Sequence, residues 1–123
     1  MKSKMFDASK CVIPNETLGQ RLTRMTADIR VHNPNRSVPA LKFKTIGRVT
    51  VLFRTKSKVG VSIMEYTDMV ENRQVFDLAV YSHKSAREVY EELRNTNRIL
   101  EATQRFNFRN DWDLVYRLIE LLS

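Results

Sequence analysis

The sequence contains little of the chemistry that builds metal and cofactor sites. Its single cysteine, Cys11, cannot form a disulfide within the chain, which is typical of a protein in a reducing compartment. The two histidines, His32 and His83, are far apart in the sequence, and with one cysteine they lack the ligand spacing of a zinc site. Neither histidine has a nucleophile at catalytic spacing. We therefore expect no metal, no cofactor and no catalytic residue.

Glycine is scarce as well, and long apolar runs are absent. The three glycines, Gly19, Gly47 and Gly60, form neither a P-loop nor a dinucleotide-binding fingerprint. No apolar run approaches the roughly 20 residues needed to cross a bilayer, and the first ten residues lack the apolar segment of a signal peptide. The sequence therefore predicts a protein that is not an enzyme, has no small-molecule substrate, does not insert into a membrane and is not exported.

Positive charge is abundant, and it is concentrated in one part of the chain. The formal net charge of the 123 residues is +7. Residues 20–60 contain ten Lys or Arg against one acidic residue, Asp28, whereas residues 61–123 contain eight against eleven. This asymmetry predicts a surface that faces a polyanion, most commonly nucleic acid. The alternative is an ordinary solvated polar face.

Alternation of apolar and polar residues predicts an antiparallel sheet over residues 21–82 of a single domain. The clearest stretch, residues 45–66, is expected to form two strands joined by a basic turn at residues 55–58. In its first strand the apolar side chains are Val49, Val51 and Phe53, and the polar side chains are Arg48, Thr50 and Arg54. This pattern predicts a sheet with one apolar face and one cationic face.

Further strands are expected at residues 23–32, near residues 41–44 and at residues 75–81, linked as a meander. Within residues 41–44, Lys42 and Lys44 are expected to point outward. Gly47 lies where the alternation slips by one residue, as it does at a β-bulge. Residues 1–20 are predicted to form an N-terminal arm or a short hairpin.

Helical spacing replaces the alternation near residue 85, and two helices are expected over residues 85–122. Ser85 and Glu88 have the pattern of a capping box, and apolar residues then recur at helical spacing as far as Phe106. A second helix is expected to begin at Asn110 or Asp111 and to reach the end of the chain.

The terminal helix is the basis of a predicted homodimer. Eight of the eleven residues from Trp112 to Leu122 are apolar, which makes a wider stripe than one sheet surface covers. We expect an obligate dimer that buries this surface. The residues assigned to the interface are Val89, Leu93, Leu100, Trp112, Val115, Leu118, Ile119 and Leu122. The alternative is a compact monomer with this helix at its centre.

The cationic face of the sheet is the predicted binding surface for single-stranded RNA. Arginine binds phosphate through two hydrogen bonds, and lysine supplies a mobile point charge. The residues assigned to RNA binding are Arg24, Arg30, Lys42, Lys44, Arg48, Thr50, Arg54, Lys56 and Lys58.

The order of these elements resembles the coat proteins of single-stranded RNA bacteriophages of the levivirus type. Residues 73–122 are similar to the last strand and the two helices of that family, and residues 22–32 and 46–54 are similar to its central strands. The resemblance implies an α+β fold in which an antiparallel β-meander sheet is followed by two C-terminal helices, in an interlocked homodimer. It also implies an icosahedral virion shell, assembled in the host cytoplasm, whose sheets bind genomic RNA and a translation-repressing RNA hairpin.

Two other functions fit the same charge pattern. One is a small oligomeric regulator that binds single-stranded nucleic acid, and the other is a matrix-type protein whose basic face binds anionic lipid. The three functions differ in assembly, because a coat protein forms large closed particles and a regulator stops at a small oligomer.

Overall fold

A five-stranded antiparallel sheet organises the computed structural model, which describes residues 13–54, 58–96, 98 and 100–123. The strands lie in the order β1-β2-β3-β4-β5, and each is antiparallel to its neighbours. The elements in chain order are α2 (Leu18–His32), β1 (Lys42–Ile46), β2 (Val49–Phe53), β3 (Gly60–Asp68), β4 (Arg73–Tyr81), α3 (Ala86–Thr96), β5 (Gln104–Phe108) and α4 (Asp111–Leu122). An α+β fold with an antiparallel sheet is therefore confirmed.

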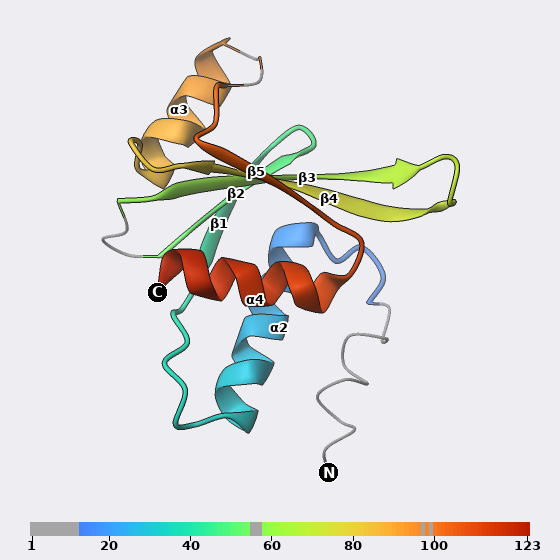
Figure 1. Cartoon of the computed structure of the whole chain (residues 1–123), viewed down its shortest axis with the longest axis vertical. Coiled ribbons are helices and arrows are strands. Elements are labelled where there is room, and N and C mark those ends of the chain that lie inside the picture. Colours follow the sequence, from blue (N-terminus) through green and yellow to red (C-terminus); the bar gives the residue numbers. More distant parts are fainter. Residues whose placement is uncertain (1–12, 55–57, 97, 99) are drawn as a thin grey trace.

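Helices cover both faces of the sheet (Figure 1). The helices α2 and α4 lie on one face and pack against each other, while α3 lies on the opposite face. This arrangement differs from the predicted sheet with one open cationic face. In β2, the adjacent residues Val51 and Leu52 are both fully buried, one on each face, because each face of this strand lies under a helix.

The larger core fills the space between the sheet and the helices α2 and α4. Its fully buried side chains include Leu22, Met25 and Ile29 of α2, Leu52 and Ile63 of the sheet, and Leu114 and Leu118 of α4. Each such side chain stabilises the fold by about 1.5–3 kcal/mol relative to an exposed one. This core fixes α2 and α4 on the sheet.

The smaller core lies between the sheet and α3. Its buried members are Val51, Ala79, Tyr81, Ala86, Val89 and Leu93. The buried hydroxyl group of Tyr81 lies 3.2 Å from that of Ser62, so the two groups satisfy each other by a hydrogen bond. A Cβ atom at Gly60 would lie 2.6 Å from Cγ2 of Val89, so the absence of a side chain there lets α3 approach the sheet closely.

Residues 23–32 form part of helix α2, and the strand predicted there is wrong. A capping box starts the helix: the backbone N–H of Thr17 donates to Gln20 Oε1 at 2.9 Å, and Thr17 Oγ1 accepts from the Gln20 N–H at 3.2 Å. Val31, which strand alternation would bury, is 73 % exposed. The sheet therefore begins at Lys42 and not at residue 21. Of the predicted N-terminal arm, residues 1–12 lie outside the described residues, and Leu18 already belongs to α2.

Gly47 belongs to a tight turn and not to the predicted bulge. Ile46 of β1 pairs directly with Val49 of β2, which leaves Gly47 and Arg48 as a two-residue hairpin loop. Gly47 has a φ of +57°, in the left-handed region that such turns require and that glycine adopts without strain.

The helix predicted to continue to Phe106 ends at Thr96, and a strand separates the two helices. Phe106 and Phe108 lie in β5, where they pair with Leu78 and Phe76 of β4. Phe106 and Phe108 alternate with Asn107 as residues of a strand do, and the prediction extended the helical series to Phe106 without this pair.

The starts of the two later helices are confirmed. Ser85 Oγ accepts a hydrogen bond from the Glu88 N–H, and Glu88 Oε1 accepts one from the Ser85 N–H, each at 3.3 Å. Asn110 is the N-cap of α4, because its Oδ1 accepts from the Trp112 N–H at 2.8 Å.

The apolar surface of α4 is buried within a single chain. Its inward residues Leu114, Val115, Leu118, Ile119 and Leu122 are all at most 2 % exposed. Helix α2 supplies the second apolar surface that the prediction assigned to a partner subunit. This burial removes the premise on which the homodimer was predicted, and the homodimer itself stays a prediction.

The other residues assigned to the dimer interface also lie in the two cores. Val89 and Leu93 of α3 are buried in the smaller core, and Leu100 packs against that core. Trp112 is half-buried and packs against the larger core. None of the helices in the described ranges is long and apolar enough to cross a membrane.

The β3–β4 hairpin extends past the helices at one end of the sheet (Figure 1). Its tip carries Met69 and Val70, which are 87 % and 95 % exposed. Below the tip, Asp68 Oδ1 accepts from the Val70 N–H at 2.9 Å, and Arg109 Nη1 lies 2.6 Å from Glu71 Oε1. The tip is thus an exposed apolar pair on an ordered support.

Candidate nucleic-acid interface

Two of the predicted RNA-binding residues, Lys42 and Lys44, lie on the edge strand β1. Both are exposed, but they lie on the sheet face that α3 covers, because they pair with Phe53 and Val51. The prediction that they share a face with Thr50 is therefore wrong. Nζ of Lys44 lies 4.8 Å from the ring centroid of Tyr90 on α3, a cation–π contact. Beside α3, the edge of the sheet is therefore cationic and bordered by an aromatic ring.

Helix α3 carries a second row of cations, on the flank that lies beside Lys42 and Lys44. Arg87, Tyr90 and Arg94 have the spacing i, i+3 and i+7, which places them on one flank of the helix. Both arginines are exposed. A hollow of about 320 Å³ separates the two rows, and its walls are Lys42, Lys44, Phe53, Ala86, Arg87 and Tyr90.

A second hollow of about 260 Å³ lies at the other end of α3. Arg48, in the β1–β2 turn, and Arg98, after the end of α3, line it together with apolar residues such as Val49 and Met64. The cations thus follow α3 from one end to the other. We call the surface formed by Lys42, Lys44, Arg48, Arg87, Tyr90, Arg94 and Arg98 the basic groove.

The opposite flank of α3 carries acidic residues, and their partners are local. Glu88 caps the helix through Ser85, and Glu92 Oε1 lies 2.8 Å from Nζ of Lys84. Hydrogen bonding to Glu92 raises the pKa of Lys84 above its ordinary value, with burial acting in the opposite direction. Glu91, four residues after Arg87 and three before Arg94, lies beside the basic flank, so the basic and acidic residues of α3 adjoin along one edge of the helix.

Within the described part of the chain, ion pairs occur outside the basic groove. Among the described residues, the arginines that pair with carboxylates are Arg21, Arg24, Arg109 and Arg117. No ion pair among those residues involves a lysine or arginine of the basic groove. Its positive charge is consequently not neutralised by the described part of the chain.

The fold separates several of the other predicted RNA-binding residues from the basic groove. Thr50 is only 4 % exposed and lies on the sheet face beneath α2. Arg24 lies on α2 and forms two hydrogen bonds with Glu16, at 2.9 and 3.0 Å. Arg30, also on α2, is exposed and donates to the carbonyl oxygen of Val38. These three residues do not form one surface with Lys42 and Lys44.

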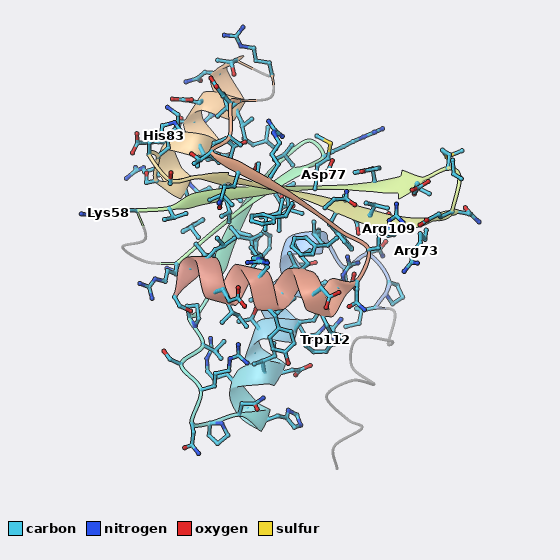
Figure 2. The ribbon with its side chains drawn as sticks, in the orientation of Figure 1. Lys58, Arg73, Asp77, His83, Arg109 and Trp112 are labelled. Atoms are coloured by element: carbon cyan, nitrogen blue, oxygen red, sulfur yellow. The ribbon has the colours of Figure 1, made fainter. Side chains whose placement is uncertain are left out.

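The remaining predicted residues lie near the connection between β2 and β3. Arg54 is half-buried, and its Nε atom is buried without a hydrogen-bond partner among the described residues. Lys58 is exposed, at the opposite end of the sheet from Arg73 and Arg109 (Figure 2). Lys56 lies outside the described residues.

Sequence reasoning missed the contribution of α3 to this surface. It placed both C-terminal helices over the apolar face and left the cationic face open, so Arg87, Tyr90 and Arg94 were not considered. The i, i+3, i+7 spacing of two arginines and a tyrosine, with glutamates on the other flank, is the pattern that would have found them.

The described residues contain no group of three or more His, Cys, Asp or Glu that could hold a metal ion. Comparisons with models of protein families, with curated proteins and with solved structures find no match.

Proposed function

We propose that the protein binds single-stranded RNA in the basic groove. The observation that supports this most directly is that six lysines and arginines gather along α3, and none of them forms an ion pair among the described residues. A surface of unpaired Lys and Arg attracts phosphates and releases condensed counterions when it binds them.

The groove combines the two kinds of contact that unpaired RNA uses. Arg87 and Arg94 can each bind a phosphate through two hydrogen bonds, and Lys42 and Lys44 supply mobile charges below them. Tyr90 lies between these rows, where its ring is available to a base in exchange for the Lys44 contact. Unpaired bases can reach such a ring, whereas stacked bases in a duplex cannot.

The test is a change of charge inside and outside the groove. The double variant Lys42→Ser with Arg87→Ser should weaken binding of a labelled single-stranded RNA about tenfold at low salt, measured by fluorescence anisotropy. The slope of log affinity against log salt should fall by about 0.7 for each lost phosphate contact. The matched control, Arg30→Ser with Arg73→Ser, removes the same charge from exposed positions outside the groove and should have little effect.

Three outcomes would contradict the proposal. An equal loss in the control would indicate binding by net charge alone. Unchanged affinity in the groove variant would place the site elsewhere. Binding of vesicles that contain phosphatidylserine, in the absence of RNA binding, would favour the matrix-type alternative.

A viral coat function is a second proposal, and it additionally requires self-assembly. The exposed Met69 and Val70 at the ordered hairpin tip favour it, because a projecting apolar pair of this kind is suited to a contact between copies. Large regular particles containing RNA, seen by light scattering and electron microscopy of the protein expressed alone, are the expected result. A monodisperse small species would favour the regulator instead.

A further inference from the structure

A polar hollow of about 620 Å³ lies on the sheet face opposite the basic groove, beside the start of α2. The face that forms it is otherwise the apolar face of the larger core. At this end of the sheet, however, four strands present polar side chains together with the β1–β2 turn. They are Thr45, Arg48, Thr50, Glu65, Thr67 and Gln74.

Strand register brings these side chains together. Thr45 of β1 is paired with Thr50 of β2, and Thr67 of β3 is paired with Gln74 of β4. Residues paired directly across two strands point to the same face of the sheet. The hollow is therefore lined by a row of hydroxyl and amide groups that the sheet holds in fixed order.

Thr50 brings a hydroxyl group to the wall of the hollow. The residue is 4 % exposed, and this group is available to water or to a ligand in the hollow. Buried hydroxyl groups are normally satisfied by protein, water or ligand. The neighbouring buried Thr26 shows the ordinary situation, because its Oγ1 donates to the Leu22 carbonyl oxygen at 2.8 Å.

Charge at the hollow is suited to one phosphate and not to several. Arg48 lines it and has no acidic partner among the described residues. The first turn of α2 also lines it through Leu18 and contains no acidic residue, so its backbone N–H groups add positive potential. Glu65 contributes a carboxylate, which is already paired with Arg21 at 2.9 Å. Because Arg21 neutralises this carboxylate, Arg48 and the start of α2 provide the remaining charge, which suits a single phosphate.

We infer that this hollow binds a free mononucleotide, separately from the RNA in the basic groove. Arg48 and the start of α2 bind its phosphate, while Thr50, Thr67 and Gln74 bind polar groups of the ribose or base. The volume of the hollow accommodates one nucleotide. This inference does not rest on the RNA-binding proposal, because its lining residues, except Arg48, lie outside the basic groove.

The experiment is a titration of the full chain with each of the four ribonucleoside monophosphates, followed by backbone amide NMR shifts. Shifts are expected at the hollow and not along the exposed flank of α3. Thr50→Val keeps the shape of the side chain and should weaken binding about two- to tenfold. Thr26→Val is the matched control, since it removes a hydroxyl group outside the hollow and should leave nucleotide binding unchanged.

Further experiments distinguish nucleotide binding in the hollow from binding in the basic groove and from binding of phosphate alone. The groove variant Lys42→Ser with Arg87→Ser should bind the mononucleotide normally, whatever it does to RNA. Inorganic phosphate that binds as tightly as the nucleotides would overturn the nucleotide assignment. The same conclusion would follow from an absence of shifts at the hollow at millimolar nucleotide, or from unchanged affinity in a folded Thr50→Val protein.

Discussion

Two carboxylates near the starts of α2 and α4 are perturbed in opposite directions. Two hydrogen bonds from Arg24, at 2.9 and 3.0 Å, lower the pKa of Glu16. Burial raises the pKa of Asp111, although Arg21 lies 3.4 Å away and acts against this shift. The two pKa values shift in opposite directions because hydrogen bonding by Arg24 is the largest effect at Glu16, whereas burial is the largest effect at Asp111.

These two shifts predict opposite dependences of stability on pH. The Glu16 contribution is present above the ordinary glutamate pKa and is lost as pH falls through the lowered value, because the unfolded chain then binds the proton more readily. For Asp111 the sign is reversed, so its contribution is present at low pH and is lost as pH rises through the raised value.

Carboxyl NMR titration should therefore find Glu16 below and Asp111 above their ordinary values. Arg24→Met should return the pKa of Glu16 toward normal without lowering that of Asp111. If both carboxylates titrated at ordinary values in the folded protein, the geometry described for these two sites would be wrong.

At the scale of elements, α2 lies so close to β1 that one residue controls the contact. A Cβ atom at Gly19 would lie 2.2 Å from Cδ2 and 2.4 Å from Cγ of Phe43. Cγ is the ring atom bonded to Cβ of Phe43, and Cδ2 is the next ring atom. The whole ring of Phe43 must therefore move to make room for a Cβ atom at Gly19. Gly19 thus sets the distance between the helix and the edge of the sheet.

Gly19→Ala should therefore destabilise the protein by about 1–3 kcal/mol despite the better helix propensity of alanine. Thermal unfolding measures this change. Gly47→Asn gives the backbone cost of replacing a glycine without any steric contact, since nothing lies within 4 Å of a Cβ atom there but its φ is positive. A stabilised Gly19→Ala protein would contradict the close contact.

The same elements show how much of the fold could be predicted from the sequence. The strands β2, β3 and β4, the capping box at Ser85 and the N-cap at Asn110 each depend on a local pattern, and each was predicted. The segment of α2 was not, because Met25 and Ile29 fit a period of two as well as helical spacing. The deciding evidence lay upstream, in the Thr17–Gln20 capping box.

The cover of the second sheet face could not be predicted for a different reason. In β2, Leu52 alternates in phase with Arg48, Thr50 and Arg54, and a single apolar residue in this polar row did not indicate that α2 and α4 cover that face. Which helix lies on which face depends on long-range packing and not on local pattern. For this reason the sequence identified Lys42, Lys44 and Arg48 but placed them with Thr50, which lies on the other face.

At the scale of the whole molecule, the stability of α4 distinguishes a monomer from an interlocked dimer. Leu118 is 0 % exposed within one chain, between the sheet and α2. Leu118→Ala should lower the free energy of unfolding by about 2–5 kcal/mol. Denaturant unfolding at several protein concentrations should give the same midpoint for wild type and variant alike, because no second chain completes the core. A midpoint that rises with concentration would restore the dimer hypothesis.

The exposed hairpin tip also has a consequence for the chemistry of sulfur. Met69 is 87 % exposed at the tip, Met64 is half-buried on β3, and Met25 is 0 % exposed in the larger core. Dilute peroxide should convert Met69 to its sulfoxide first and leave Met25 unreacted, as seen by mass spectrometry of the peptides that contain each residue. If Met25 were oxidised as early as Met69, α2 would have left the sheet. The oxidation rate of Met25 therefore reports the integrity of the larger core.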